Sequence, residues 1–257
     1  MTSEGRDKSC HHSPVEPGDI QKLKDSGVIG TDNPKALQRL VWFSLALHFG
    51  KRGAEGWRGM SKTTLVIHVD DQGEEFLEYN ACEKQKNHPG DVSAASYKPE
   101  ARVYARPGNP YCPVTAYKKY LSLLHPDLEV LWQRPNNNWM PNQQCFWYYK
   151  SPIGQSTINK MMKKMSEEAK LSKIYTNHCL RATVSKGLAD AGYERTDICV
   201  VTGHGSIKSL DPYINRPSDL KKRNLSENIG KMICSGSKQK AGKVADKENV
   251  NIHAAKQ

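Results

Sequence analysis

The sequence lacks the patterns that mark a metal-bound, disulfide-bonded or membrane-spanning protein. Its seven cysteines include no C-x-x-C pair, so neither a zinc ribbon nor a disulfide framework is predicted, and scattered thiols are typical of a reducing compartment. No stretch reaches the about 18 apolar residues that a membrane-spanning helix needs. The first residues, MTSEGRDKSCHHSP, contain no apolar signal segment. We therefore expect no membrane partner and no resident metal.

Positive charge is what the sequence has in excess. Its 38 Lys and Arg residues outnumber 27 Asp and Glu residues, which gives a formal net charge of +11 and a pI near 9.2. This balance favours a polyanionic partner, either nucleic acid or an anionic membrane surface, although a basic protein with a solvated face would show it too. With 37% hydrophobic residues, the middle of the chain is expected to be globular.

Hydrophobic periodicity predicts a fold that is mainly α with a small antiparallel β-sheet inserted early, in the α+β class. Thr63–Val69 is β-branched, Asp70–Gly73 is a turn signal, and Glu75–Tyr79 is typical of a returning strand. A third strand is expected at Ala101–Ala105 and an aromatic strand at Cys145–Tyr149. Helices are expected over residues 19–25, 34–48, 113–124, 156–169, 196–201 and 218–233, with others carrying Leu180, Val184 and Leu188 up to Gly192 and starting after Ser206 or Ser209.

Composition divides the chain into three segments. Residues 1–14 are expected to be a disordered tail, residues 15–233 a single domain, and residues 234–257 a disordered basic tail. The run Cys10–His12 offers metal-binding groups, but a polar tail is the favoured interpretation. The methionine stripe at positions 161, 162 and 165 is interpreted as core packing on one side of a helix.

An enzyme that breaks DNA without a metal needs three kinds of group. Arginine stabilises the charge that develops on the scissile phosphate, since its planar fork of donors matches phosphate oxygens. A tyrosine hydroxyl, with a free pKa of about 10, can attack phosphorus once neighbouring cations or a base help remove its proton. The leaving 5′-oxygen must receive a proton, a role that suits lysine.

The sequence contains a matching set near its carboxyl end. His178 and Arg181 form an H-x-x-R pair, which shares one face if the segment is helical. His204 follows Arg181 by 23 residues, and Tyr213 follows His204 by nine. Taken singly, Tyr213 is better read as a half-buried aromatic residue and His204 as a helix cap. The spacing of the four residues taken together favours a shared site over these single-residue interpretations.

This spacing is similar to the carboxyl-terminal motif of the tyrosine recombinase (phage integrase) family. The upstream segment LHFGKRGAE resembles the first box of that family, with Arg52 followed three positions later by Glu55. The β-ribbon that follows should carry the lysine of the family, for which Lys84 is the first choice and Lys86 the second. The resemblance covers about residues 15–233 and implies the catalytic-core fold of that family.

The resemblance also implies the chemistry and the role of each residue. Tyr213 would attack the phosphate and form a 3′-phosphotyrosyl link, Arg52 and Arg181 would hold the non-bridging oxygens, and His204 would add a hydrogen bond. His178 would act as a general base or support the transition state. The bond energy would be retained in the covalent intermediate, so no cofactor, ATP or metal is implied. The partners would be double-stranded DNA and further copies of the chain.

Lys84 would protonate the leaving oxygen, and Glu55 would support the arginines. Two departures from the family pattern stand out: Gly205 follows His204, and Pro212 restricts the residue before Tyr213. The family also has an amino-terminal DNA-clamping domain, for which the residues before 15 are too few. We therefore expect weak, salt-sensitive DNA binding from this chain alone.

A narrower resemblance suggests the source and leaves alternatives open. Segments such as SPIGQSTINKMMKKMSEEAKLSKIYTNHCLRATVSKGL and VTGHGSIKSLDPYINRPSD resemble eukaryotic Crypton-type recombinases, which derive from transposable elements, and equally the related domain of zinc-finger MYM-type and glutamine-rich host proteins. Site-specific recombination or integration in the nucleus is the first hypothesis. The second is a domesticated, catalytically silent DNA-binding or chromatin-associated module. The third is a nicking and closing activity like that of type IB topoisomerases.

Overall fold

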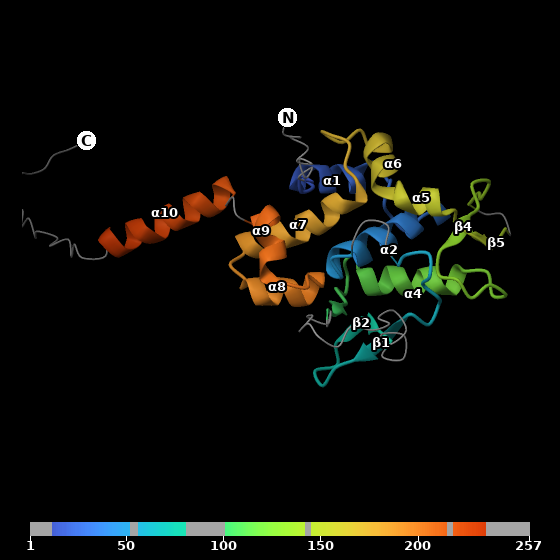
Figure 1. The fold of residues 1–257 in the computed structure, drawn as a ribbon. Helices are drawn as coiled ribbons and strands as arrows, with labels where there is room; N and C mark the ends of the chain where they lie inside the picture. Colours follow the sequence, from blue (N-terminus) through green and yellow to red (C-terminus); the bar gives the residue numbers. More distant parts are fainter. Residues whose placement is uncertain (1–11, 52–55, 81–100, 142–144, 215–217, 235–257) are drawn as a thin grey trace, which may run out of the picture. The chain divides into compact units, whose positions relative to one another are not determined.

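A long apolar helix, α2 (Pro34–His48), forms the centre of the structure (Figure 1). Pro34 stands at its first turn, and the Asn33 side chain caps it by accepting a hydrogen bond of 2.9 Å from the Ala36 backbone N–H. Because α2 is buried on nearly all sides, helices pack around it, including α4 (Pro113–Leu123) and α7 (Asn177–Asp190). The computed structural model describes residues 12–51, 56–80, 101–141, 145–214 and 218–234.

The early antiparallel sheet is confirmed, with strand order β1-β2-β3. Strands β1 (Leu65–Val69) and β2 (Glu75–Tyr79) form a hairpin in which Leu65 pairs with Tyr79. Gly73 closes the turn with a positive φ of 83°, a conformation that glycine adopts without steric cost. Strand β3 (Val103–Tyr104) pairs with β2 and is shorter than the five residues predicted.

A second, two-stranded sheet differs from the prediction. Strand β5 (Tyr148–Pro152) lies three residues later than the expected strand at 145–149, and its partner β4 (Gln133–Pro135) was not predicted. Tyr148 explains the shift, because its fully buried ring faces the core and its hydroxyl donates to the Pro34 carbonyl at 2.7 Å. Tertiary burial, which local propensity does not contain, therefore determines where this strand begins.

The helix predicted over residues 156–169 is divided into α5 (Gln155–Asn159) and α6 (Met161–Glu168). The break occurs because the buried Asn177 side chain bonds to both flanking segments. Its amide donates to the Ile158 carbonyl at 2.8 Å and accepts from the Met162 N–H at 3.0 Å. The methionine stripe is confirmed as core, since Ile158, Met161, Met162 and Met165 are all buried.

The carboxyl-terminal helices surround a small core of their own. Helix α7 is followed by α8 (Arg195–Thr202), the short 3₁₀ segment η1 (Ile207–Leu210) and α9 (Asp211–Ile214). Leu210 packs with Ile198, Cys199 and Ala189 in a buried cluster, which attaches η1 to α7 and α8. The helix predicted over residues 196–201 is confirmed as α8, and Gly203 caps it with φ 63°. Helix α1 (Pro17–Asp25) also lies where it was predicted.

A second unit of the chain follows Arg216. Its described part is α10 (Asp219–Cys234), close to the predicted helix over residues 218–233, with Leu225 and Ile229 exposed. None of the helices in the described ranges has the length and apolar character needed to cross a bilayer.

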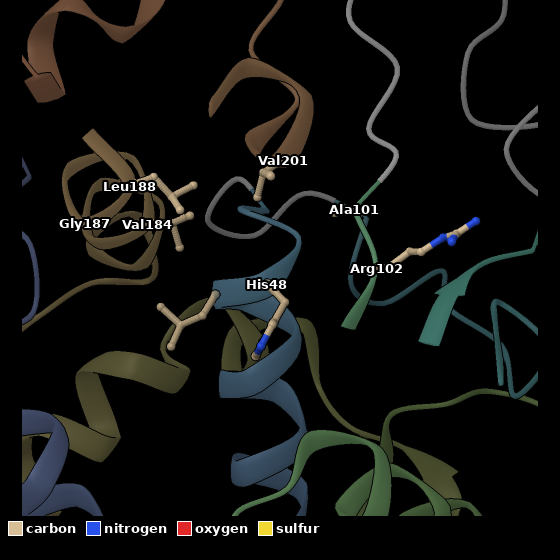
Figure 2. A pocket seen from close by; sticks show the side chains of 8 residues that line it. His48, Ala101, Arg102, Val184, Gly187, Leu188 and Val201 are labelled. Carbon is tan, nitrogen blue, oxygen red and sulfur yellow. The ribbon is translucent and has the colours of Figure 1, made fainter. Parts of the chain in front are cut away.

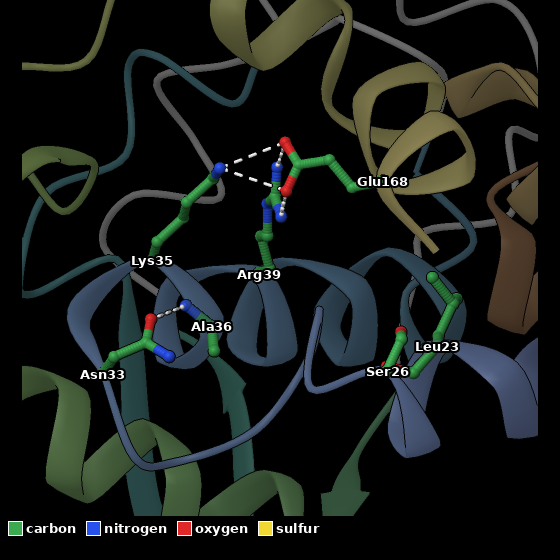
Figure 3. Close-up of polar contacts among 7 residues, drawn as sticks. All are labelled: Leu23, Ser26, Asn33, Lys35, Ala36, Arg39 and Glu168. Atoms are coloured by element: carbon green, nitrogen blue, oxygen red, sulfur yellow. Dashed lines mark hydrogen bonds and ion pairs between the residues drawn. The ribbon is translucent and has the colours of Figure 1, made fainter. Parts of the chain in front are cut away.

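A charged cluster joins α2 to α6 beside a polar cleft of about 310 Å³ (Figure 3). The buried guanidinium of Arg39 binds both carboxylate oxygens of Glu168, at 2.7 and 2.8 Å, and Lys35 reaches the same carboxylate at 3.0 Å. A buried guanidinium needs such a partner because it has lost its hydration. The cluster therefore fixes α6, and with it the segment leading to α7, against the central helix.

Glu168→Gln is expected to lower the free energy of unfolding at pH 7 by about 2 kcal/mol, since Arg39 would stay buried without a carboxylate. The loss is smaller than for a fully buried pair, because the Glu168 side chain is 41% exposed. Hydrogen bonds from Arg39, and then from Lys35, lower the pKa of Glu168 to about 2. The stabilisation should thus be complete above pH 4.5 and disappear as the pH falls towards 2. Urea unfolding at several pH values measures it.

Glu167→Gln is the matched control on the same helix. Its pair with Lys163 spans 3.9 Å between side chains that are 54% and 51% exposed, so the change should stay below about 0.5 kcal/mol. Equal losses in the two variants would contradict the role assigned to the Arg39 cluster.

Candidate functional site

Helix α7 carries both residues of the H-x-x-R pair. Its first turn presents His178 to solvent, and Arg181, one turn later, points into the protein and is only 5% exposed. The predicted helical spacing is therefore confirmed. The two side chains interact, since Arg181 contributes to lowering the pKa of His178.

The Arg181 guanidinium joins three parts of the chain that are far apart in sequence. Its Nη1 donates to the Gly50 carbonyl at 2.7 Å and, over a shorter distance, to the Thr202 carbonyl. Its Nε donates to His204 Nε2 at 3.2 Å. Gly50 lies two residues after the end of α2, and Thr202 ends α8, so one cation joins the ends of two helices to the loop that carries His204.

Gly50 allows this close approach. It adopts a φ of +51°, and a Cβ built on it would lie 2.7 Å from the Thr202 Cα. No other residue type fits this backbone contact without displacement, because both the positive φ and the short separation exclude a side chain. The contact brings residue 50, two positions before Arg52, against the Arg181 site.

His204 is 3% exposed, and both of its ring nitrogens have protein partners. Because Arg181 Nε can only donate, His204 Nε2 accepts, and the ring proton then belongs on Nδ1. Nδ1 lies 2.5 Å from the Thr202 hydroxyl, which donates in turn to the Ile198 carbonyl at 2.5 Å. The chain of bonds assigns a neutral, Nδ1-protonated tautomer to His204, held by the last turn of α8.

Tyr213 lies beside this cluster, on α9. Its half-buried ring meets the His204 ring edge-on, with centroids 5.6 Å apart and an interplanar angle of 63°. Leu210 anchors the preceding segment in the core, and an ion pair of 2.6 Å between Arg195 and Asp211 joins the starts of α8 and α9. Pro212 falls in the first turn of α9, where its missing N–H breaks no helical hydrogen bond.

His178 is covered by a residue from the amino-terminal segment. The His12 ring stacks on the His178 ring, with centroids 5.0 Å apart and planes 15° from parallel. Partial burial lowers the pKa of His178, and the charges of His12 and Arg181 lower it further. Residues 12–14 were included in the predicted disordered tail, yet His12 makes this contact; residues 1–11 lie outside the described ranges.

Arg52, Glu55, Lys84 and Lys86 all lie outside the described residues. The neighbouring Lys51 is described, and its Nζ lies 4.8 Å from the centroid of the Trp57 ring and 5.3 Å from that of the Tyr79 ring. In the ranges that the structure describes, no three His, Cys, Asp or Glu side chains are grouped so that they could hold a metal ion. The described part of the site thus consists of Arg181, His204 and Tyr213, with His178 on the same helix as Arg181.

An apolar cleft of about 450 Å³ adjoins the cluster (Figure 2). Figure 2 shows Val184 and Leu188 of α7 together with Val201 of α8 and His48 of α2. Val184 lies one turn after Arg181, and Val201 precedes Thr202. Helices α2, α7 and α8 therefore all line this cleft, next to the place where Arg181 bonds to the ends of α2 and α8.

Residues 19–167 match a protein family described as a domain of unknown function, DUF3504, which is more than half of the chain. The chain belongs to the DUF3504 family. No curated protein matches it. The matched range ends before α7 begins, so the part of the fold that carries His178, Arg181, His204 and Tyr213 lies beyond it.

Two solved structures are similar to this DUF3504 chain. With the XerA recombinase the TM-score is 0.50 at 16% identity, covering 87% of this chain and 66% of that one. With the XerH site-specific recombinase, in a post-cleavage complex with its palindromic difH substrate, it is 0.53 at 15% identity, covering 87% and 55%. The chain thus spans less than two thirds of each. At these identities the likeness shows the fold alone, that of a tyrosine recombinase catalytic domain.

Sequence reasoning gave no role to three residues of this site. No role was predicted for Gly50 or Thr202, and His12 was assigned only to a polar tail. The first signal was available, because a glycine directly after an apolar helix often adopts a positive φ. The contacts of Thr202 and His12 depend on long-range packing, which no local pattern contains.

Gly50→Ala is expected to lower the free energy of unfolding by at least about 2 kcal/mol, because it combines an unfavourable φ with a backbone clash. The clash would also move the carbonyl that Arg181 uses. Gly187→Ala is the control: this glycine lies inside α7 with nothing within 4 Å of its added Cβ, so stability should rise by about 0.5–1 kcal/mol. Urea unfolding compares the two, and a Gly50→Ala protein as stable as the wild type would refute the contact.

Proposed function

We propose that this chain is the catalytic domain of a DNA strand-transfer enzyme of the tyrosine recombinase type. The Tyr213 Oη forms a bond to the scissile phosphorus as the bond between phosphorus and the 5′-oxygen breaks. The tyrosine proton passes to a base, for which His178 is the candidate, and the leaving oxygen takes a proton. The products are a 3′-phosphotyrosyl link and a free 5′-hydroxyl, and attack by a second 5′-hydroxyl reverses the step.

The observation that carries the proposal is the joining of Arg181, His204 and Tyr213. Arg181 Nε bonds to His204, and the Tyr213 ring lies against His204. These three residue types supply a cation for phosphate oxygens, a hydrogen-bonding imidazole and a hydroxyl nucleophile. Packing alone gives no reason for three such groups, spaced 23 and nine residues apart in sequence, to meet.

The remaining roles rest on sequence resemblance. Arg52 would join Arg181 on the phosphate, and the bond from Arg181 to Gly50 supports this, since Gly50 is two residues from Arg52. Glu55 would support the arginines. Lys84, with Lys86 as the second choice, would protonate the leaving 5′-oxygen.

The finer identity is also a proposal. On the segments quoted above, we assign the chain to the Crypton-type recombinases or their host-gene relatives, which act in the nucleus on double-stranded DNA as homo-oligomers. The net charge of +11 supports a DNA partner, and the XerH structure is described as a complex with its DNA substrate.

A second candidate is a DNA-binding or chromatin-associated module that does not cut. The burial of the cluster favours it, because Arg181 and His204 are 5% and 3% exposed and bond to groups of the protein itself. The Nε and Nη1 donors of Arg181 are thus directed at protein acceptors. A module that only binds DNA does not need these donors at a phosphate.

Tyr213→Phe is expected to abolish covalent adduct formation, because it removes the only atom that can form the phosphotyrosyl bond while keeping the ring on His204. The assay incubates the protein, without metal, with a broad pool of nicked duplexes that trap the intermediate, and detects the adduct on a denaturing gel. Tyr193→Phe is the control, since this tyrosine is 58% exposed on the loop after α7 and should leave the adduct unchanged.

Peptide mapping of the wild-type adduct should place the nucleotide on Tyr213. If the wild-type protein forms no adduct with any duplex of the pool while binding them, the cleavage proposal fails and the binding module is the better description. If both tyrosine variants lose the adduct equally, the assignment of Tyr213 is wrong.

A further inference from the structure

The segment before α1 forms a short strap, residues 12–16, that is bonded to α7 and to the segment just before it. The Val15 N–H donates to the Thr183 hydroxyl at 2.8 Å, and the Glu16 N–H donates to the Tyr175 hydroxyl at 3.3 Å. Val15 itself is buried in the main core. Lys173 adds an ion pair of 3.6 Å with Glu16. The strap is thus held at its carboxyl end by backbone hydrogen bonds, core packing and charge.

Asp19 makes this attachment rigid. Its buried carboxylate accepts from the Ser172 N–H at 3.0 Å and from the Tyr175 hydroxyl at 2.8 Å. Burial alone would raise the pKa of Asp19, but hydrogen bonds from Ser172, Tyr175 and Lys22 hold it well below its usual range. The Tyr175 hydroxyl, which accepts the hydrogen bond from the Glu16 N–H, is therefore itself bonded to α1. Tyr175 lies two residues before α7 begins.

Because the strap is fixed at Val15 and Glu16, His12 falls over the first turn of α7. Its ring lies nearly parallel to the His178 ring, and its Nδ1 lies 3.4 Å from the Thr176 hydroxyl. His178 is otherwise an exposed side chain at a helix start. Stacking on one side restricts the rotamers that such a ring can sample.

We propose that His12 is a positioning residue for His178, and that the strap holds this imidazole in place at the strand-transfer site. The catalytic part of this inference rests on the function proposed above, whereas the contact between His12 and His178 is independent of it. The charged or titratable groups recorded around His178 in the described ranges are His12 on the strap and Arg181 on α7. Partial burial, followed by the electrostatic effects of His12 and Arg181, lowers the pKa of His178 and favours its neutral form, which is the form that can accept the proton of a tyrosine.

The first experiment measures His178 directly, without DNA. The ring carbon-bound proton signals of the histidines are followed by NMR as a function of pH in the wild type, His12→Ala and His12→Phe. The pKa of His178 should rise towards 6.5 in His12→Ala, which removes both the burial and the charge. It should rise less in His12→Phe, which keeps a stacked ring and removes the charge. The anchors at Val15 and Glu16 remain, so both variants should fold.

Two further variants complete the measurement. Thr183→Val removes the acceptor of the Val15 N–H and should reproduce part of the His12→Ala shift by loosening the strap. His68→Ala is the matched control, since His68 is a half-exposed imidazole on β1 that contacts Phe76 and Glu78, and it should leave His178 unchanged. If His12→Ala does not move the His178 titration, the proposal is overturned whatever the activity of the protein.

The second experiment follows adduct formation against pH in the same variants. In His12→Ala the acid limb should move to higher pH by the interval measured for His178, and the rate on the alkaline plateau should fall several-fold as the ring loses its orientation. His12→Phe should restore the plateau rate. A His178 shift without a change in the acid limb overturns the catalytic role of the strap. Absence of any wild-type adduct overturns the proposed function, while the NMR result still decides whether His12 positions His178.

Discussion

The structure of the site depends on one buried guanidinium. Arg181 could not remain buried as a cation unless its N–H groups found acceptors, because an unpaired buried charge costs several kcal/mol. The acceptors come from the ends of α2 and α8 and from His204. The hydrogen bonds of one side chain therefore determine where α2 contacts α7 and α8, which are more than a hundred residues away in sequence. Gly50 is needed for this contact because a side chain at this position would clash with Thr202.

How far the sequence predicted this arrangement depends on the range of each interaction. His178 and Arg181 lie one helical turn apart on α7, and α8 matches the helix predicted over residues 196–201, because both depend on local periodicity. Strand β4, the break at Asn177 and the stacking of His12 were not predictable in this way, since each depends on a partner distant in sequence. Arg52, Glu55, Lys84 and Lys86 stay predictions.

The burial of the cluster is compatible with phosphate chemistry. The acceptors of the Arg181 Nε and Nη1 protons are two carbonyl oxygens and an imidazole nitrogen, which are neutral. A phosphate oxygen is an ionised acceptor, and hydrogen bonds between charged partners are about twice as strong as neutral ones. A phosphate oxygen would therefore compete well with one of these carbonyl oxygens for a guanidinium N–H. The present bonds orient the guanidinium.

His204 converts this orientation into a position for Tyr213. Its Nδ1 is tied to Thr202 and its Nε2 to Arg181, so the ring cannot rotate without breaking one of these bonds. The edge of that fixed ring forms one wall of the space that Tyr213 occupies, and Leu210 holds the approach of α9 from the other side. Pro212 adds stiffness in the first turn of α9 and costs no helical hydrogen bond. The packing of its ring on His204 thus keeps Tyr213 beside the arginine cluster.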